Sequence, residues 1–267
     1  MDVLPAKPGF TVGDYAIDIL VQGFPGKSVC HGGLGWSTIA LLRGQSGAAA
    51  GRIVLFDTGS FSQRRLLVDG LATHGLSCAD VTDVVLSHAH WDHSVNWIMF
   101  PQARVWIGKA EMEWAINEPI GANPLPELYV RELHRSPQLI TLEEGQECAP
   151  GIRAYLAPGH TPGHVIYVLE GPDRDLIFTG DSAKNRIELI TGEADMTYDP
   201  AVTKATVDKI WGFWTRRPGS IVLPGHDMPM VLDNGSPRFI GEREAAISCW
   251  FGDTLDQTTL IQLLPKG

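Results

Sequence analysis

The segment His88–His93 is the densest group of chemically active side chains in the sequence. It reads His-Ala-His-Trp-Asp-His, so three of the nine histidines and one aspartate lie within six residues. Neutral imidazole and carboxylate groups are ligands that suit zinc and similar divalent ions. In an extended or tightly turned backbone, His88 and His90 point to one side, and Asp92 and His93 can face a second ion. The segment therefore predicts a site for two metal ions.

Two coordination spheres need more ligands than this segment supplies. His160, Asp181 and His226 are suitable, and each follows an apolar run that reads as a buried strand. A carboxylate can bridge two ions because each of its oxygens can bind one, so Asp181 is the expected bridge. The predicted ligands are His88, His90, His160 and Asp181 for one ion, and Asp92, His93, Asp181 and His226 for the other.

A catalytic site of this kind keeps an open position for water on each ion. Two zinc ions lower the pKa of a bridging water towards neutrality and hold it as hydroxide, which attacks a substrate carbonyl. Asp92 is the candidate catalytic residue, because a carboxylate bound through one oxygen can protonate the leaving group. Iron or manganese is the alternative to zinc.

Short apolar strands alternate with helical patterns along the whole sequence, and glycine and proline separate them. The helical patterns cover Lys109–Asn117 and Pro200–Arg217, and Glu118–Pro126 reads as a loop and a candidate lid. The predicted strands are Ile53–Phe56, Val84–Leu86, Val105–Ile107, Ile152–Leu156, Val165–Leu169, Leu176–Phe178 and Ile221–Leu223. No linker or low-complexity tract divides the chain, so residues 1–267 are expected to form one α/β domain with two sheets and helices outside them.

Several motifs occur in an order that resembles the metallo-β-lactamase-fold hydrolase superfamily. They are Phe56-Asp57-Thr58-Gly59, the segment His88–His93, Pro158-Gly159-His160-Thr161-Pro162-Gly163-His164, Thr179-Gly180-Asp181 and Pro224-Gly225-His226. The resemblance implies an αββα sandwich of two mixed β-sheets flanked by helices, with a dinuclear site on one edge. It also implies that Asp57 orients the histidine cluster and that His164 is structural and not a ligand.

The resemblance favours a zinc-dependent hydrolase of a small-molecule ester, lactone or thioester. Quorum-quenching lactonases carry a tyrosine shortly after the bridging aspartate, where this sequence has Lys184. Glyoxalase-II-like thioesterases usually add a C-terminal helical domain, which Asp227–Gly267 is too short to form. A phosphodiesterase or nuclease of the same fold and a metal-bound sensor without turnover stay open as alternatives.

Four residues are candidates for contact with the substrate. Lys184 and Arg186 follow the expected bridge closely and can grip a carboxylate or phosphate. Trp91 and Trp36 are candidates for an apolar pocket wall. Lys184 and Arg186 are equally consistent with a solvated loop, and both tryptophans with the core.

Composition limits partners and compartment. The chain has 267 residues and a net charge of −10, which disfavours nucleic acid. The sequence has no apolar run long enough for a membrane span, and Met1–Gly9 lacks the pattern of a signal peptide, so a cytoplasmic protein is expected. The cysteines, at positions 30, 78, 148 and 249, are expected to be free thiols. A homodimer is possible.

Overall fold

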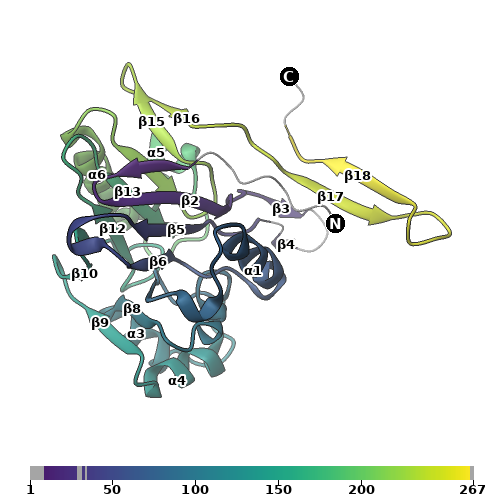
Figure 1. Cartoon of the computed structure of the whole chain (residues 1–267), viewed down its shortest axis with the longest axis horizontal. Helices are drawn as coiled ribbons and strands as arrows, with labels where there is room; N and C mark the ends of the chain where they lie inside the picture. Colours follow the sequence, from purple (N-terminus) through teal and green to yellow (C-terminus); the bar gives the residue numbers. More distant parts are fainter. Residues whose placement is uncertain (1–8, 29–31, 34, 265–267) are drawn as a thin grey trace.

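The computed structural model describes residues 9–28, 32, 33 and 35–264. Two seven-stranded sheets dominate it (Figure 1). The first sheet has the order β1-β2-β5-β6-β7-β8-β9, and the second runs from β10 to β16 in chain order. Parallel pairs lie next to antiparallel pairs in both sheets, so both are mixed, as expected.

The strands of the first sheet are Phe10–Val12, Tyr15–Val21, Ile39–Gly44, Ile53–Phe56, Asp83–Val85, Arg104–Gly108 and Leu139–Leu142. Those of the second sheet are Glu147–Ala149, Ile152–Leu156, Val165–Leu169, Leu176–Gly180, Ile221–Pro224, Met230–Asp233 and Ser236–Phe239. A small hairpin is formed by β3 (Lys27–Ser28) and β4 (Gly32–Gly33). The helices are α1 (Arg64–Thr73), α2 (Trp91–Ser94), α3 (Lys109–Asn117), α4 (Glu127–Arg135), α5 (Arg186–Thr191) and α6 (Pro200–Arg216).

The main core lies between the two sheets. Phe56 of β6 stacks there on Tyr167 of β12 and Phe178 of β13, with ring centroids 5.9 and 4.9 Å apart. Successive residues of a strand point to opposite faces, so Val54 and Phe56 enter this core while Leu55 faces the helices. Burying apolar side chains on both faces explains why the central strands read as continuous apolar runs.

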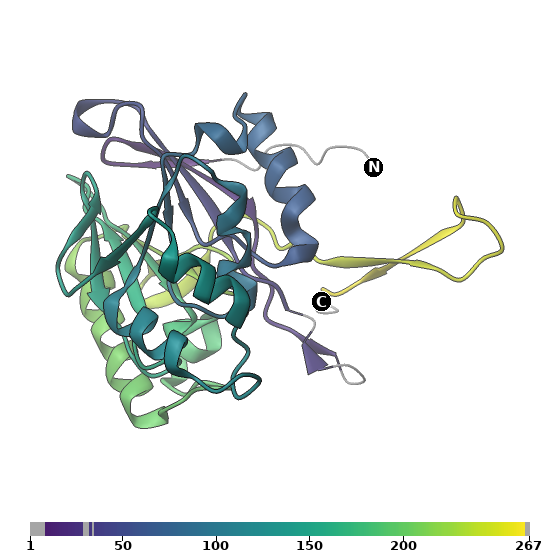
Figure 2. The same ribbon diagram turned by 90° about the horizontal axis from the view of Figure 1, so that it is seen from below.

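Helices cover the outer face of each sheet. Residues of α1, α3 and α4 pack with the outer side chains of the first sheet, and residues of α5 and α6 pack with those of the second. Figure 2 shows the resulting four layers from a second direction. The expected αββα sandwich is confirmed.

The predicted elements agree closely with the observed ones. The helix Lys109–Asn117 has the predicted bounds, and α6 ends one residue earlier than predicted, at Arg216. Residues 118–126 are irregular, and the Pro124 carbonyl accepts a hydrogen bond of 3.1 Å from the Trp91 N–H. The proposed lid role of this loop stays a prediction.

Other expectations concern the surface and the thiols. Cys78, Cys148 and Cys249 are free, and Cys30 lies outside the described residues, as do residues 1–8 of the N-terminal segment. None of the described helices is long and apolar enough to cross a membrane. After the second sheet the chain forms a separate hairpin of β17 (Ala246–Trp250) and β18 (Thr258–Gln262), which projects from the body (Figures 1 and 2).

Candidate metal centre

The seven predicted ligands lie on loops that leave the strands at one edge of the sandwich. His88 follows β7, His90 directly precedes the short helix α2, and Asp92 and His93 lie within that helix. His160 lies between β11 and β12, and Asp181 and His226 follow the parallel strands β13 and β14. Because neighbouring parallel strands end at the same edge, their following residues meet there. The structure therefore brings together side chains up to 138 positions apart, from His88 to His226.

Three imidazoles form the first group. The ligand atoms of His88, His90 and His160 all lie within 4.8 Å of one another, and His160 Nε2 is 3.0 Å from His90 Nδ1. The Nδ1 of His160 lies 3.0 Å from the Met196 carbonyl oxygen, an acceptor, so that nitrogen carries the proton and Nε2 presents a lone pair. Burial lowers the pKa of His88 and His160 well below 6.5, and that of His90 to about 4. All three are therefore neutral and able to bind a cation.

The second group combines two imidazoles with a carboxylate. His93 Nε2 lies 3.2 Å from His226 Nε2, and Asp92 Oδ2 lies 3.3 Å from His226 Nε2 and 3.6 Å from His93 Nε2. Burial lowers the pKa of both histidines, but nearby carboxylates outweigh it and raise that of His226 to about 9 and that of His93 well above 6.5. Burial raises the pKa of Asp92, but His93 and His226 outweigh it and lower it to about 2. This part of the centre favours positive charge.

Asp181 lies between the two groups. Its Oδ2 is 3.4 Å from His160 Nε2, while its Oδ1 is 3.3 Å from Nε2 of both His93 and His226. Burial raises the pKa of Asp181, but the histidines outweigh it and keep that pKa well below 3.8. An ionised carboxylate thus turns one oxygen towards each group.

Asp57 connects β6 to the histidine segment. Its Oδ2 accepts hydrogen bonds from His93 Nδ1 at 2.7 Å and from the Ser87 hydroxyl at 2.8 Å, and its Oδ1 accepts from the Ser87 N–H at 2.8 Å. The backbone of Asp57 has a φ of 53°, a left-handed conformation that is uncommon outside glycine. Because Nδ1 of His93 is held by a carboxylate, its Nε2 is directed into the second group.

His164 contacts Asp181 and belongs to neither group. Its Nε2 accepts a hydrogen bond of 3.0 Å from the Asp181 N–H, and its Nδ1 lies 2.7 Å from the Ser182 hydroxyl. Burial lowers the pKa of His164 to about 3, so it is neutral. These contacts fix the backbone of Asp181 and agree with a structural role.

Glu111, which no sequence pattern indicated, is a fully buried residue in the first turn of α3. Its Oε1 accepts from the Ala89 N–H at 2.9 Å, and its Oε2 accepts from the Thr161 hydroxyl at 2.7 Å and the Gly163 N–H at 3.2 Å. Burial outweighs these hydrogen bonds and raises the pKa of Glu111 to about 7. Glu111 therefore joins the two ligand-bearing loops.

The four predicted substrate contacts have different surroundings. Trp91 is 43% exposed, and Trp36 stacks on Phe24 with ring centroids 4.7 Å apart. Lys184 is largely buried, and its Nζ lies 3.0 Å from Oε1 of Glu188. Lys184 thus forms an internal ion pair, and its predicted substrate contact is untested.

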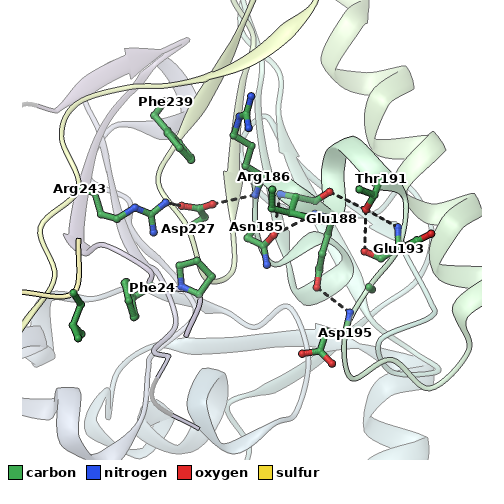
Figure 3. Close-up of a pocket in the computed structure, with 14 residues that line it drawn as sticks. Phe24, Asn185, Arg186, Glu188, Thr191, Glu193, Asp195, Asp227, Phe239 and Arg243 are labelled. Atoms are coloured by element: carbon green, nitrogen blue, oxygen red, sulfur yellow. Dashed lines mark hydrogen bonds and ion pairs between the residues drawn. The ribbon is translucent and has the colours of Figure 1, made fainter. Parts of the chain in front are cut away.

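Arg186 lines a cavity of about 840 Å³, and none of the seven predicted ligands lines it. Phe24, Phe239 and Arg243 also line it, as does Asp227, which follows the predicted ligand His226. Figure 3 shows the Arg243 guanidinium directed at the Asp227 carboxylate, which also accepts a hydrogen bond of 3.0 Å from the Arg186 N–H. Asp227, the sequence neighbour of His226, is therefore the link between this cavity and the metal centre.

Comparison with known proteins identifies a family and several relatives. A family model described as the metallo-beta-lactamase superfamily matches residues 41–226. The chain is 27% identical over 177 residues to metallo-beta-lactamase domain-containing protein 1 of Rattus norvegicus, covering 66% of this chain and 62% of that protein. It is 23% identical over 166 residues to an N-acyl homoserine lactonase of Bacillus thuringiensis, and the match covers 61% of this chain and 62% of the lactonase. The chain thus spans about three fifths of the length of these curated relatives.

A solved structure supports the fold over almost the whole chain. The dizinc quorum-quenching lactonase AidC, in complex with a product, superposes with a TM-score of 0.70. The superposition covers 91% of this chain and 99% of AidC at 20% sequence identity. At this identity the likeness shows a shared fold.

Proposed function

The chain belongs to the metallo-beta-lactamase superfamily. From this premise we propose that it is a metal-dependent hydrolase that binds two divalent ions, and that zinc is the favoured metal. Its substrate is a small-molecule ester, lactone or thioester. The observation that carries the proposal is the position of Asp181, whose two oxygens face two separate groups of nitrogen and oxygen ligands at 3.3–3.4 Å.

The side chains fit such ions. His88 Nε2 is buried and has no hydrogen-bond partner among the described residues. A buried polar atom without a partner costs free energy, and a bound cation would satisfy it. His88, His90, His160 and Asp181 would hold one ion, and Asp92, His93, Asp181 and His226 the other. Imidazole and carboxylate donors in these numbers suit zinc.

When bound, zinc supplies Lewis acidity, which lowers the pKa of a water and polarises an acyl oxygen. The protein's own contribution centres on Asp92. Because the pKa of Asp92 is held to about 2, its carboxylate is ionised and cannot act first as an acid. Its second oxygen, the one not turned towards His93 and His226, can accept a proton from the attacking water and then donate that proton to the leaving group. Asp57 supports this by holding the neighbouring His93 through Nδ1.

The substrate class rests on relatives. One relative is named an N-acyl homoserine lactonase, and the superposed AidC structure holds a homoserine product. Lactones, esters and thioesters share the acyl carbon that a water attacks.

The charges on α6 do not favour a nuclease. The basic side chains of α6 are each paired with a carboxylate at 2.8–3.1 Å, and Arg217, directly after the helix, is paired at 3.6 Å. They are Lys204, Lys209, Arg216 and Arg217. Paired cations attract a phosphate backbone weakly, so this edge of α6 does not favour a phosphodiester substrate.

The test combines metal analysis with a substrate panel. Protein purified without added metal is analysed for zinc, iron and manganese, and is assayed on acyl lactones, thioesters and bis(p-nitrophenyl) phosphate. His90→Ala and Asp181→Ala are expected to lose turnover and bound metal together, whereas His134→Ala, an exposed histidine on α4, retains both. Wild-type turnover in either site variant, or no turnover of any substrate by the metal-loaded protein, would refute the proposal.

A further inference from the structure

We propose that Met196 is a positioning residue whose backbone carbonyl, aimed by a left-handed backbone conformation, holds His160 in place as a ligand of the first metal ion. His160 Nδ1 lies 3.0 Å from that carbonyl oxygen. The inference rests on the proposed function, since it takes His160 to bind an ion. It adds that His160 depends on residues 195–199, a segment between α5 and α6 that carries none of the predicted ligands.

The backbone conformation of Met196 is unusual. Three non-glycine residues in the described part of the chain have a positive φ, and they are Asp57, Met196 and Asn234. Aspartate and asparagine adopt this conformation more readily than other residues, because their short polar side chains can bond to the local backbone. Methionine has no such compensation, so the surroundings of Met196 hold its φ at 52°. Strain of this kind commonly persists where it serves a functional site.

Two of these three residues contact a histidine of the candidate metal centre. Asp57 accepts a hydrogen bond from His93 Nδ1 through its side chain, and Met196 accepts one from His160 Nδ1 through its carbonyl. In both cases the acceptor fixes the tautomer and directs Nε2 towards the position of a cation. His160 belongs to the first group of ligands and His93 to the second. Each group therefore has a supporting residue of its own.

The residues on either side of Met196 fix its position. Before it, the Asp195 N–H donates to the buried Glu188 carboxylate at 3.3 Å, as Figure 3 shows. After it, the Thr197 hydroxyl donates to the Gly159 carbonyl at 2.7 Å. Neither contact involves the Met196 side chain, so the direction of its carbonyl is set by the backbone and its neighbours.

The same segment also holds the loop that carries His160. The carbonyl of Gly159, which directly precedes His160, accepts from the Asp199 N–H at 2.9 Å as well as from Thr197. The loop is thus bound at two points, the carbonyl before His160 and the ring Nδ1. Two contacts restrict both the place and the rotation of the imidazole, and a ligand that is placed in advance loses less entropy when an ion binds.

A set of substitutions at Met196 separates its carbonyl from its side chain. The side chain is 64% exposed, so its replacement removes little packing. Met196→Gly accepts a positive φ readily, whereas Met196→Ile strongly disfavours it because the Cβ is branched. A role of the carbonyl therefore predicts that glycine is tolerated and isoleucine is not. A role of the side chain predicts the reverse.

The first measurement is zinc binding to the apo protein in a chelator competition, with far-UV circular dichroism to establish that each variant is folded. Wild type and Met196→Gly are expected to bind two ions per chain with similar affinity. Met196→Ile is expected to bind one of the two ions about 10–100-fold more weakly, which is the usual effect of losing such a partner. The matched control is Asn234→Ile, which imposes the same demand at a φ of 50° in the exposed turn between β15 and β16. It is expected to bind zinc as the wild type does.

The second measurement needs neither zinc nor turnover. In side-chain ¹⁵N NMR of the apo protein, with the signals assigned by comparison with His160→Gln, His160 is expected to be protonated at Nδ1 in the wild type and in Met196→Gly. Met196→Ile is expected to show a mixture of the two ring tautomers. A wild-type His160 that is protonated at Nε2 overturns the proposal whether or not any variant folds.

Three results of the zinc measurement also overturn the proposal. They are wild-type affinity in Met196→Ile, binding that is equally weak in Met196→Gly and Met196→Ile, and an equal loss of affinity in Asn234→Ile. A wild type that binds no zinc while His160 is protonated at Nδ1 refutes the proposed function, and with it the ligand role of His160, but supports the contact with Met196. The two failures are therefore distinguishable.

Discussion

Glu111→Gln gives a direct test of the buried carboxyl that joins the two ligand-bearing loops. Glu111 is fully buried, and burial raises its pKa from 4.5 to about 7. In the unfolded chain the same carboxyl titrates near its usual value. Glutamine keeps the shape of the side chain but has no charge to titrate.

The sign of the effect follows from this pKa. A folded-state pKa above the unfolded value means that the folded protein holds the proton more tightly. The stabilisation from that proton is complete below the unfolded pKa of 4.5, and it is lost as the pH rises through about 7. A shift of about 2.5 pKa units corresponds to roughly 3 kcal/mol in total, and about 2 kcal/mol of this falls between about pH 5.5 and pH 8.5.

The assay is urea unfolding of wild type and Glu111→Gln at about pH 5.5 and pH 8.5, with both proteins at the same metal content. Other titrating groups are shared, so the difference between the two proteins isolates Glu111. The stability of the variant relative to wild type is expected to rise by about 2 kcal/mol from the lower to the higher pH. A difference that stays constant within about 0.5 kcal/mol would refute the reasoning, because a neutral and an ionised Glu111 would then be equally stable in the fold.

Glu111→Ala separates the hydrogen bonds from the charge. It leaves the Ala89 N–H, the Thr161 hydroxyl and the Gly163 N–H without their acceptor, and each loss costs about 1–3 kcal/mol. Alanine is therefore expected to destabilise the protein by at least about 3 kcal/mol at the lower pH, where the carboxyl is neutral. The difference in free energy of unfolding between wild type and Glu111→Ala is expected to be smaller at the higher pH. There the wild type bears the cost of a buried ionised carboxylate, and the variant has no carboxylate.

Three further predictions concern Asp57, the binding of zinc and the close packing at Gly163. Asp57→Asn is expected to weaken zinc binding by about 10–100-fold in a chelator competition, because the carboxylate that holds His93 is lost, and unchanged affinity would contradict this role. Zinc at about 100 times its dissociation constant is expected to stabilise the apo protein by about 2.7 kcal/mol in thermal unfolding, and no shift would show that the folded state does not bind it. Gly163→Ala is expected to destabilise the protein by at least about 1–3 kcal/mol, since its new Cβ would lie 2.0 Å from the backbone nitrogen of Glu111. Gly212→Ala on α6 meets nothing within 4 Å and is expected to be neutral or stabilising, which makes it the matched control.

The order of apolar runs and polar motifs in the sequence predicted much of the fold, and it predicted that the seven candidate ligands would lie close together. The central strands are apolar on both faces and end in residues that are rare in cores, so the rule that sites form at strand ends identified His88, Asp181 and His226. The strands β11 and β12 have the predicted bounds because turn residues flank both of them. Local signals of this kind are available in one sequence.

Contacts that depend on packing between elements were not predictable in the same way. Glu111 is buried because α3 packs against the loop at Gly163, and charged residues in a first helical turn are usually exposed. The ion pair of Lys184 with Glu188 had a local signal, since the two residues are four apart, but that spacing is informative only once α5 is located. Only the three-dimensional arrangement shows that β17 and β18 form a separate hairpin and join neither seven-stranded sheet.

The non-ligand residues around the centre have a common logic, because each connects two segments that carry predicted ligands or their neighbours. Asp57 joins β6 to Ser87 and His93, Glu111 joins Ala89 to Thr161 and Gly163, and His164 joins its own loop to Asp181 and Ser182. All three are fully buried, where hydrogen bonds are strong and an unpaired group is costly. The loops are therefore held in place by the protein itself. In zinc fingers the ion supplies the folding energy, whereas here the folded sandwich supplies the positions, and ligands placed in advance reduce the ordering cost of binding an ion.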